Sequence, residues 1–145
     1  MTPELTALTL AALLQIGQFC AYSLTAIQQV GVKAAAGPRD EHIVLTGTAG
    51  RLQRAMNNHF EGLILFTIAV LVVTLSDQST PFTAISAFTY LAARVAYIPV
   101  YVFGWAPWRS AIWAVGLLAT LMMLLASLFY PYAFHTLSIR PKSKE

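Results

Sequence analysis

The sequence predicts an all-α integral membrane protein, an antiparallel bundle of four transmembrane helices that forms a single domain over residues 1–145. Two observations predict this fold class. The chain is 57% hydrophobic and only 10% charged, whereas soluble domains carry about 25% charged residues. Four segments are also long and apolar enough to cross a bilayer, which takes about 20 residues; they cover residues 5–27, 50–76, 81–103 and 110–134.

The first and fourth segments contain no charged side chain. The N-terminus lacks the positive flank of a secretory signal, and its apolar run is too long for one. We therefore interpret residues 5–27 as a mature first span. The second segment is long enough but polar in its first half, and the third is apolar except for Arg94.

The connections between the last three segments are short, which predicts antiparallel neighbours. The longest loop covers residues 28–49 and contains the Gly37-Pro38 breaker. The loops after the first and third segments carry five basic residues, against three after the last segment: Lys33, Arg39, Arg51, Arg54 and Arg109 against Arg140, Lys142 and Lys144. The positive-inside rule then predicts that both termini are non-cytoplasmic. Short loops without targeting signals suit a bacterial inner membrane.

Charge and cysteine content exclude several other classes. The net charge of +3 is too small and too scattered for nucleic-acid binding, although the basic tail favours anionic lipid headgroups. The single Cys20 permits no disulfide framework or thiolate metal cluster within one chain. We expect no metal site, because no second His or Cys lies at ligand spacing from His59.

Two polar stripes mark the second and third segments. At 3.6 residues per turn, the first stripe falls within about 80° of arc, and the second ends toward Arg109. Because the second segment starts where the third ends, both stripes are expected at similar depth and form one polar pocket. The first stripe is Arg51, Arg54, Asn58 and Glu61, and the second is Arg94, Tyr97 and Tyr101.

Ionisable groups inside a membrane are costly and persist where they pair or function. Arginine binds carboxylates through a two-pronged fork, and Glu61 would hold an ammonium. Glutathione, with two carboxylates and one ammonium, is a ligand of this kind, and a cation beside its thiol favours the thiolate. The structural alternative is that Arg51 and Arg54 extend to lipid headgroups while Glu61 pairs with Arg94. His59 lies off the stripe, which is typical of a packing or headgroup residue.

The stripes also resemble motifs of the MAPEG family, the membrane-associated proteins in eicosanoid and glutathione metabolism, which include the microsomal glutathione transferases. Residues 51–61, RLQRAMNNHFE, resemble the family's second-helix signature. Residues 94–101, RVAYIPVY, followed by Trp108-Arg109-Ser110, resemble its third helix and the start of its fourth. The resemblance covers nearly the whole chain.

The resemblance implies a homotrimer with each active site between neighbouring subunits, near the cytoplasmic face. It implies glutathione as cofactor and a lipophilic co-substrate that arrives from the bilayer. Arg109 would stabilise the thiolate, with Ser110 beside it. By the same resemblance, glutathione would be bound by Arg51, Arg54, Asn58, Glu61, Arg94, Tyr97 and Tyr101.

The chain departs from the family pattern at two places. The eicosanoid enzymes have an arginine near the end of the first helix, where this chain reads QQVGVK at residues 28–33. Lys33 would replace that arginine only as a point charge. Gly62 stands where some members have an aromatic residue. The leading hypothesis is therefore a glutathione-dependent transferase or peroxidase acting on a lipophilic electrophile or lipid hydroperoxide. The alternative is a non-catalytic protein of the same fold that binds a lipid or partner. A small transporter is disfavoured because no inverted repeat is present.

Overall fold

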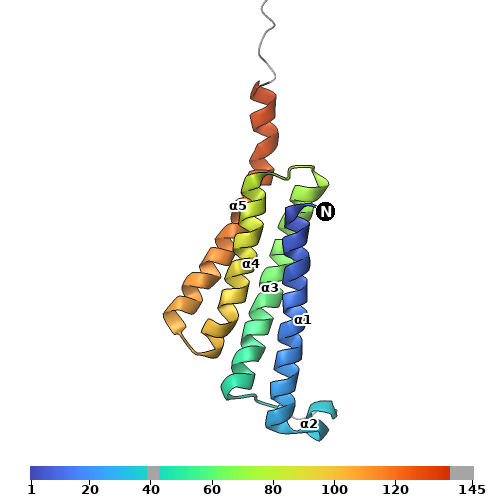
Figure 1. The fold of residues 1–145 in the computed structure, drawn as a ribbon, viewed down its shortest axis with the longest axis vertical. Coiled ribbons are helices and arrows are strands. Elements are labelled where there is room, and N and C mark those ends of the chain that lie inside the picture. Colours follow the sequence, from blue (N-terminus) through green and yellow to red (C-terminus); the bar gives the residue numbers. More distant parts are fainter. Residues whose placement is uncertain (39–42, 138–145) are drawn as a thin grey trace, which may run out of the picture.

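The computed structural model describes residues 1–38 and 43–137, so Arg39, Arg140, Lys142 and Lys144 of the orientation argument lie outside the described residues. Its helices are α1 (Pro3–Val30), the short α2 (Val32–Ala36), α3 (Gly47–Leu75), α4 (Pro81–Val102) and α5 (Ala106–Leu137) (Figure 1). Among the described residues, α1, α3, α4 and the 106–129 part of α5 are long and apolar enough to span a membrane. The predicted all-α, four-span fold class is confirmed.

Local signals explain where most of the helices begin and end. Thr2 caps α1, and Thr80 and Thr83 form a capping box at the start of α4, ahead of Pro81. Helix α1 ends at Gly31, whose φ of 83° favours glycine and whose N–H donates to the Ile27 carbonyl at 2.8 Å. Helix α1 therefore includes the whole segment 5–27, and α4 includes all but the last residue of the segment 81–103.

The start of the last helix differs from the prediction. Helix α5 begins at Ala106, whereas the sequence placed the start of the span at Ser110. Pro107 was interpreted as part of the connection, but proline is well tolerated in the first turn of a helix, where its missing N–H costs nothing. Arg109 consequently projects from the first turn of α5 and not from a loop. Helix α2, within the first loop, was not predicted at all.

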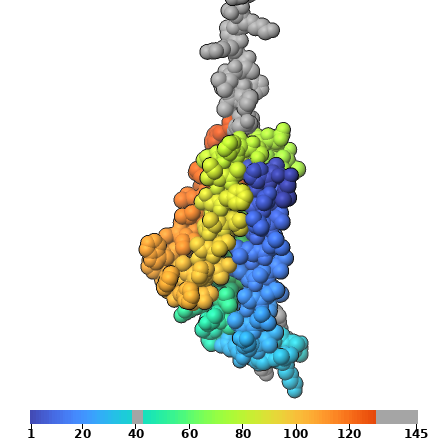
Figure 2. All heavy atoms as spheres, viewed as in Figure 1, coloured from blue at the N-terminus to red at the C-terminus, as the bar shows by residue number. Residues whose placement is uncertain are grey.

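The long helices pack as an antiparallel bundle in which α3 contacts α1, α4 and α5, and α4 contacts α1 and α5. Figure 2 shows α1 and α4 side by side on one face of the molecule. The N-terminal end of α1 and the α3–α4 turn lie at one end, while α2 and the α4–α5 connection lie at the other (Figure 1). The beginning of α3 and the end of α4 therefore share one end of the bundle.

The core combines small residues with one aromatic pair. Phe66 of α3 stacks on Tyr90 of α4 with ring centroids 3.9 Å apart, and both side chains are fully buried. Ala7 and Ala11 of α1 are also fully buried in this cluster. Small side chains let membrane helices approach closely, because dispersion contacts replace the hydrophobic drive that is absent in lipid.

A buried carboxylate links α1 to α4 at the end opposite α2. Glu4 has no exposed surface. Its carboxylate accepts hydrogen bonds from the hydroxyl of Ser79, at 2.9 and 3.0 Å, and from the hydroxyl of Thr83 in the first turn of α4. The sequence prediction placed Glu4 outside the first span, whereas α1 begins at Pro3 and includes it.

We expect Glu4→Ala to destabilise the bundle by about 1–3 kcal/mol, because two hydroxyl donors lose their buried acceptor. Glu4→Gln should cost less, since its carbonyl oxygen still accepts. Asp77→Asn is the matched control: it removes one negative charge at the same end from an exposed residue and should leave stability unchanged. Unfolding of the detergent-purified protein measures all three. Equal stability of Glu4→Ala and the unmodified protein would contradict the assignment.

Candidate functional site

The two predicted polar stripes meet at the end of the bundle where α3 begins and α4 ends. The guanidinium Nη1 of Arg51 donates to the Val102 carbonyl at 2.8 Å, which joins the first turns of α3 to the last turn of α4. Gly104, with φ of 77°, lies directly against this guanidinium. The two stripes are therefore at similar depth along the bundle.

One hydrogen bond connects the first residue of the α4 stripe to the α3 stripe. Arg94 of α4 donates from Nη1 to the side-chain Oδ1 of Asn58 of α3 at 3.0 Å. Arg94 is only 4% exposed, and its guanidinium carbon lies 5.0 Å from the centre of the Tyr90 ring, in cation–π geometry. The expected structural partner of Arg94 was Glu61, but the residue that accepts from it is Asn58, one turn earlier.

The rest of the α4 stripe leads to Arg109. The rings of Tyr97 and Tyr101 lie 5.4 Å apart, and the guanidinium carbon of Arg109 lies 4.9 Å from the centre of the Tyr101 ring. Tyr97 is buried, whereas Tyr101 and Arg109 are half-buried. A planar guanidinium stacked on a phenol ring keeps its N–H donors free at the edge, so Arg109 is held by packing while its donors remain available.

The remaining predicted residues face outward. Arg51, Arg54, Glu61 and Ser110 have exposed side chains in the single protomer. Lys33, the expected substitute for the missing first-helix arginine, is also exposed and lies on α2. The candidate site thus has an inward part, the buried Arg94 and Tyr97 with the half-buried Asn58, and an outward part of two cations and one anion.

A second polar layer was missed by the sequence analysis. The side-chain amide of Gln18 of α1 lies 2.6 Å from the ring Nδ1 of His59, which is 1% exposed. Gln15 of α1, one turn earlier, donates to the Met56 carbonyl at 3.4 Å. His59 is a packing residue, as expected, but its partner was not identified. Gln15 and Gln18, three residues apart in the middle of the first apolar segment, were the available signal.

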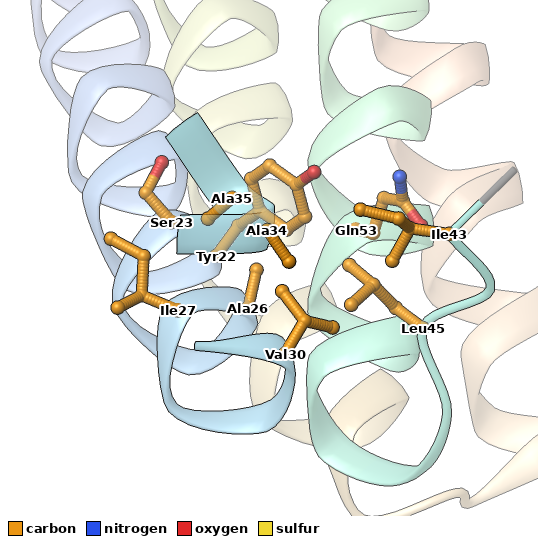
Figure 3. A pocket seen from close by; sticks show the side chains of 10 residues that line it. All are labelled: Tyr22, Ser23, Ala26, Ile27, Val30, Ala34, Ala35, Ile43, Leu45 and Gln53. Carbon is orange, nitrogen blue, oxygen red and sulfur yellow. The ribbon is translucent and has the colours of Figure 1, made fainter. Parts of the chain in front are cut away.

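One cavity is lined by none of the residues of the two stripes. Its volume is about 430 Å³ and it opens between the end of α1, α2, the segment before α3 and Gln53 (Figure 3). The side chains that line it are apolar except for those of Tyr22, Ser23 and Gln53. None of the predicted site residues lines it.

Comparisons with known proteins show to which protein family the chain belongs. Neither the comparison with curated proteins nor that with solved structures gave a match. In the part of the chain that the structure describes, no group of three or more His, Cys, Asp or Glu residues is placed to hold a metal ion. The family model described as "MAPEG family" matches residues 5–129, which include all four helices that are able to span a membrane. The chain is therefore an integral membrane protein that belongs to the MAPEG family.

Proposed function

We propose that the protein is a membrane-bound glutathione-dependent transferase or peroxidase that acts on a lipophilic electrophile or lipid hydroperoxide. The observation that carries this proposal is the meeting of two polar stripes at one end of an apolar bundle, joined by the Arg94–Asn58 hydrogen bond. Membership of the MAPEG family supports it, because that family includes glutathione transferases and peroxidases.

The outward part of the stripe has the charges that glutathione requires. Arg51 and Arg54 are exposed on the first turns of α3 and would bind its two carboxylates. Glu61, exposed two to three turns further on, would bind the ammonium. Since these groups face out of the protomer, a neighbouring subunit of a homotrimer would close the site on its open side. The orientation predicted from the basic residues would place this end of the bundle in the cytoplasm.

Arg109 would hold the thiolate of bound glutathione, with the Ser110 hydroxyl beside it. The cation lowers the thiol pKa, so the thiolate forms on binding without a separate general base. In conjugation, the thiolate attacks an electrophilic carbon, a C–S bond forms and the leaving group departs with its electron pair. In peroxide reduction, the thiolate attacks oxygen, the O–O bond breaks and the alkoxide takes a proton. A second glutathione then displaces the sulfenic hydroxyl as water and gives the disulfide.

The alternative is a non-catalytic MAPEG-fold protein that binds a lipid or a partner, and one observation favours it. Where the eicosanoid enzymes have an arginine, this chain has glutamines. The Gln29 side chain is engaged within its own chain, because it donates to the Thr46 hydroxyl at 2.6 Å and accepts from the Thr46 N–H. Turnover of a general aryl halide with glutathione distinguishes the two functions, since only the enzyme consumes the halide.

We expect Arg109→Ala to lower the conjugation rate by about 100-fold, the scale of losing one donor to a developing anion. The ultraviolet absorbance of bound thiolate near neutral pH should disappear with it, because the thiol pKa returns toward its ordinary value. Arg109→Lys keeps a positive charge and should retain part of the thiolate signal. Full conjugation activity in Arg109→Ala would contradict the proposal that Arg109 stabilises the thiolate.

For Glu61→Gln we expect about tenfold weaker glutathione binding, through loss of one charge-assisted contact, with the fold of the protomer intact because Glu61 is exposed there. Titration calorimetry measures the affinity, and light scattering measures the oligomer. A glutathione analogue without the amino group should bind both proteins equally. Dissociation of the trimer would instead make Glu61 a structural residue.

A further inference from the structure

We propose that Gly62 and Arg94 are positioning residues, which fix the Asn58 side-chain amide so that it presents an N–H donor to an oxygen acceptor of the bound ligand. The ligand's identity rests on the proposed function, and the acceptor is a carboxylate or a peptide carbonyl of glutathione. Neither positioning residue needs to touch the ligand.

Gly62 makes room for the Arg94 guanidinium. A Cβ atom built on Gly62 would lie 2.1 Å from Nη2 and 2.8 Å from the guanidinium carbon of Arg94. Side chains do not approach so closely, so any other residue at position 62 would displace the guanidinium. Gly116 of α5 also faces Arg94, but a Cβ there would lie 3.7 Å from Nε, an ordinary contact distance. Of the two glycines, only Gly62 has no room for a Cβ atom beside the guanidinium.

The guanidinium is then fixed by its other neighbours. It lies over the Tyr90 ring at 5.0 Å, and that ring is itself stacked on Phe66 at 3.9 Å. Nη1 donates to Asn58 at 3.0 Å, and the side chain is 96% removed from solvent. Because a guanidinium carries donors and no acceptor, the amide atom that faces it must be the Asn58 oxygen.

The orientation of Asn58 follows from this bond. The amide oxygen and nitrogen lie on opposite sides of one planar group, so fixing Oδ1 against Arg94 turns Nδ2 away from it. Asn58 is half-buried and shares its stripe with the exposed residues Arg54 and Glu61, so the outward face of its amide consists of N–H donors. An amide that rotates freely would present either its N–H donors or its carbonyl oxygen to a ligand. This fixed amide presents only its N–H donors, so it selects an acceptor oxygen on the ligand.

Asn58→Asp separates this role from a purely structural one. The aspartate carboxylate accepts from Arg94 as well as the amide does, so the fold and the Arg94 position should persist, but the outward donor is replaced by an acceptor. We expect glutathione binding, measured by calorimetry, to weaken by about tenfold or more. Asn57→Asp is the matched control, because it adds the same charge one residue away on an exposed side chain; its affinity should change by less than about twofold. Unchanged affinity in Asn58→Asp would overturn the proposal.

A second pair of variants tests the positioning residues directly. Gly62→Ala should weaken glutathione binding by about tenfold, because the new methyl group displaces Arg94 and frees the amide. The methyl group of Gly116→Ala would lie at an ordinary contact distance from the same guanidinium, so this variant should leave glutathione binding unchanged. In an Asn58→Ala background, Gly62→Ala should cause no further loss of affinity. An additive loss there would mean that Gly62 acts by another route, and the proposal would fail even if Gly62→Ala alone behaved as expected.

The outcomes also separate this inference from the proposed function. If the unmodified protein does not bind glutathione, the proposed function fails, and the donor assignment that rests on it falls as well. If the unmodified protein binds glutathione and Asn58→Asp binds it equally, the proposed function stands and only this inference is overturned. Should Gly62→Ala fail to fold, the Asn58→Asp and Asn57→Asp pair still decides the question.

Discussion

Burial of the Arg94 guanidinium is the constraint around which this end of the bundle is arranged. A charged side chain inside a membrane-spanning helix costs several kcal/mol unless neighbouring groups replace its solvent. Here the Asn58 oxygen accepts a hydrogen bond from the guanidinium, the face of the Tyr90 ring lies against it, and Gly62 leaves the space that it occupies. Each belongs to α3 or α4, and Gly116 of α5 covers the remaining side. The guanidinium fits here only because Gly62 has no side chain, since a Cβ atom at Gly116 would lie at an ordinary contact distance of 3.7 Å from Nε.

Polar contacts of the same kind set the position of α1. Near its start, Glu4 accepts from Ser79 and Thr83, and near its middle, Gln18 contacts the buried ring of His59. Between them, alanines fill the contact with α3 and α4. Lipid offers no hydrophobic drive for helices to associate, so directional contacts and close packing have to determine which helix faces which. The proposed site lies at one end of this frame and the Glu4 cluster at the other.

The sequence predicted the helices well and their contacts less well, for a physical reason. Hydropathy and helical periodicity are local, so the four spans and the two stripes followed directly from them. Glu4 was left outside the first span because its partners lie 75 and 79 positions away in the chain. Periodicity also showed that Arg94 faces α3, but not whether Asn58 or Glu61 accepts from it. Gly62 was interpreted as a missing aromatic residue, whereas in three dimensions its missing side chain is what admits Arg94.

The division of the α3 stripe into an inward and an outward part bears on how the site is completed. Asn58 has its partner within the protomer, while Arg51, Arg54 and Glu61 remain exposed within or beside a membrane-spanning helix. Exposed ionic groups at that depth are costly against lipid, so they require water, a charged ligand or another protein surface. Arg51 and Arg54 near the end of α3 can reach water, but Glu61 lies further along the span and cannot do so easily. A ligand ammonium held against Glu61, with a second subunit excluding lipid, satisfies this group, which is why the proposed site is best understood as one that a single protomer leaves open.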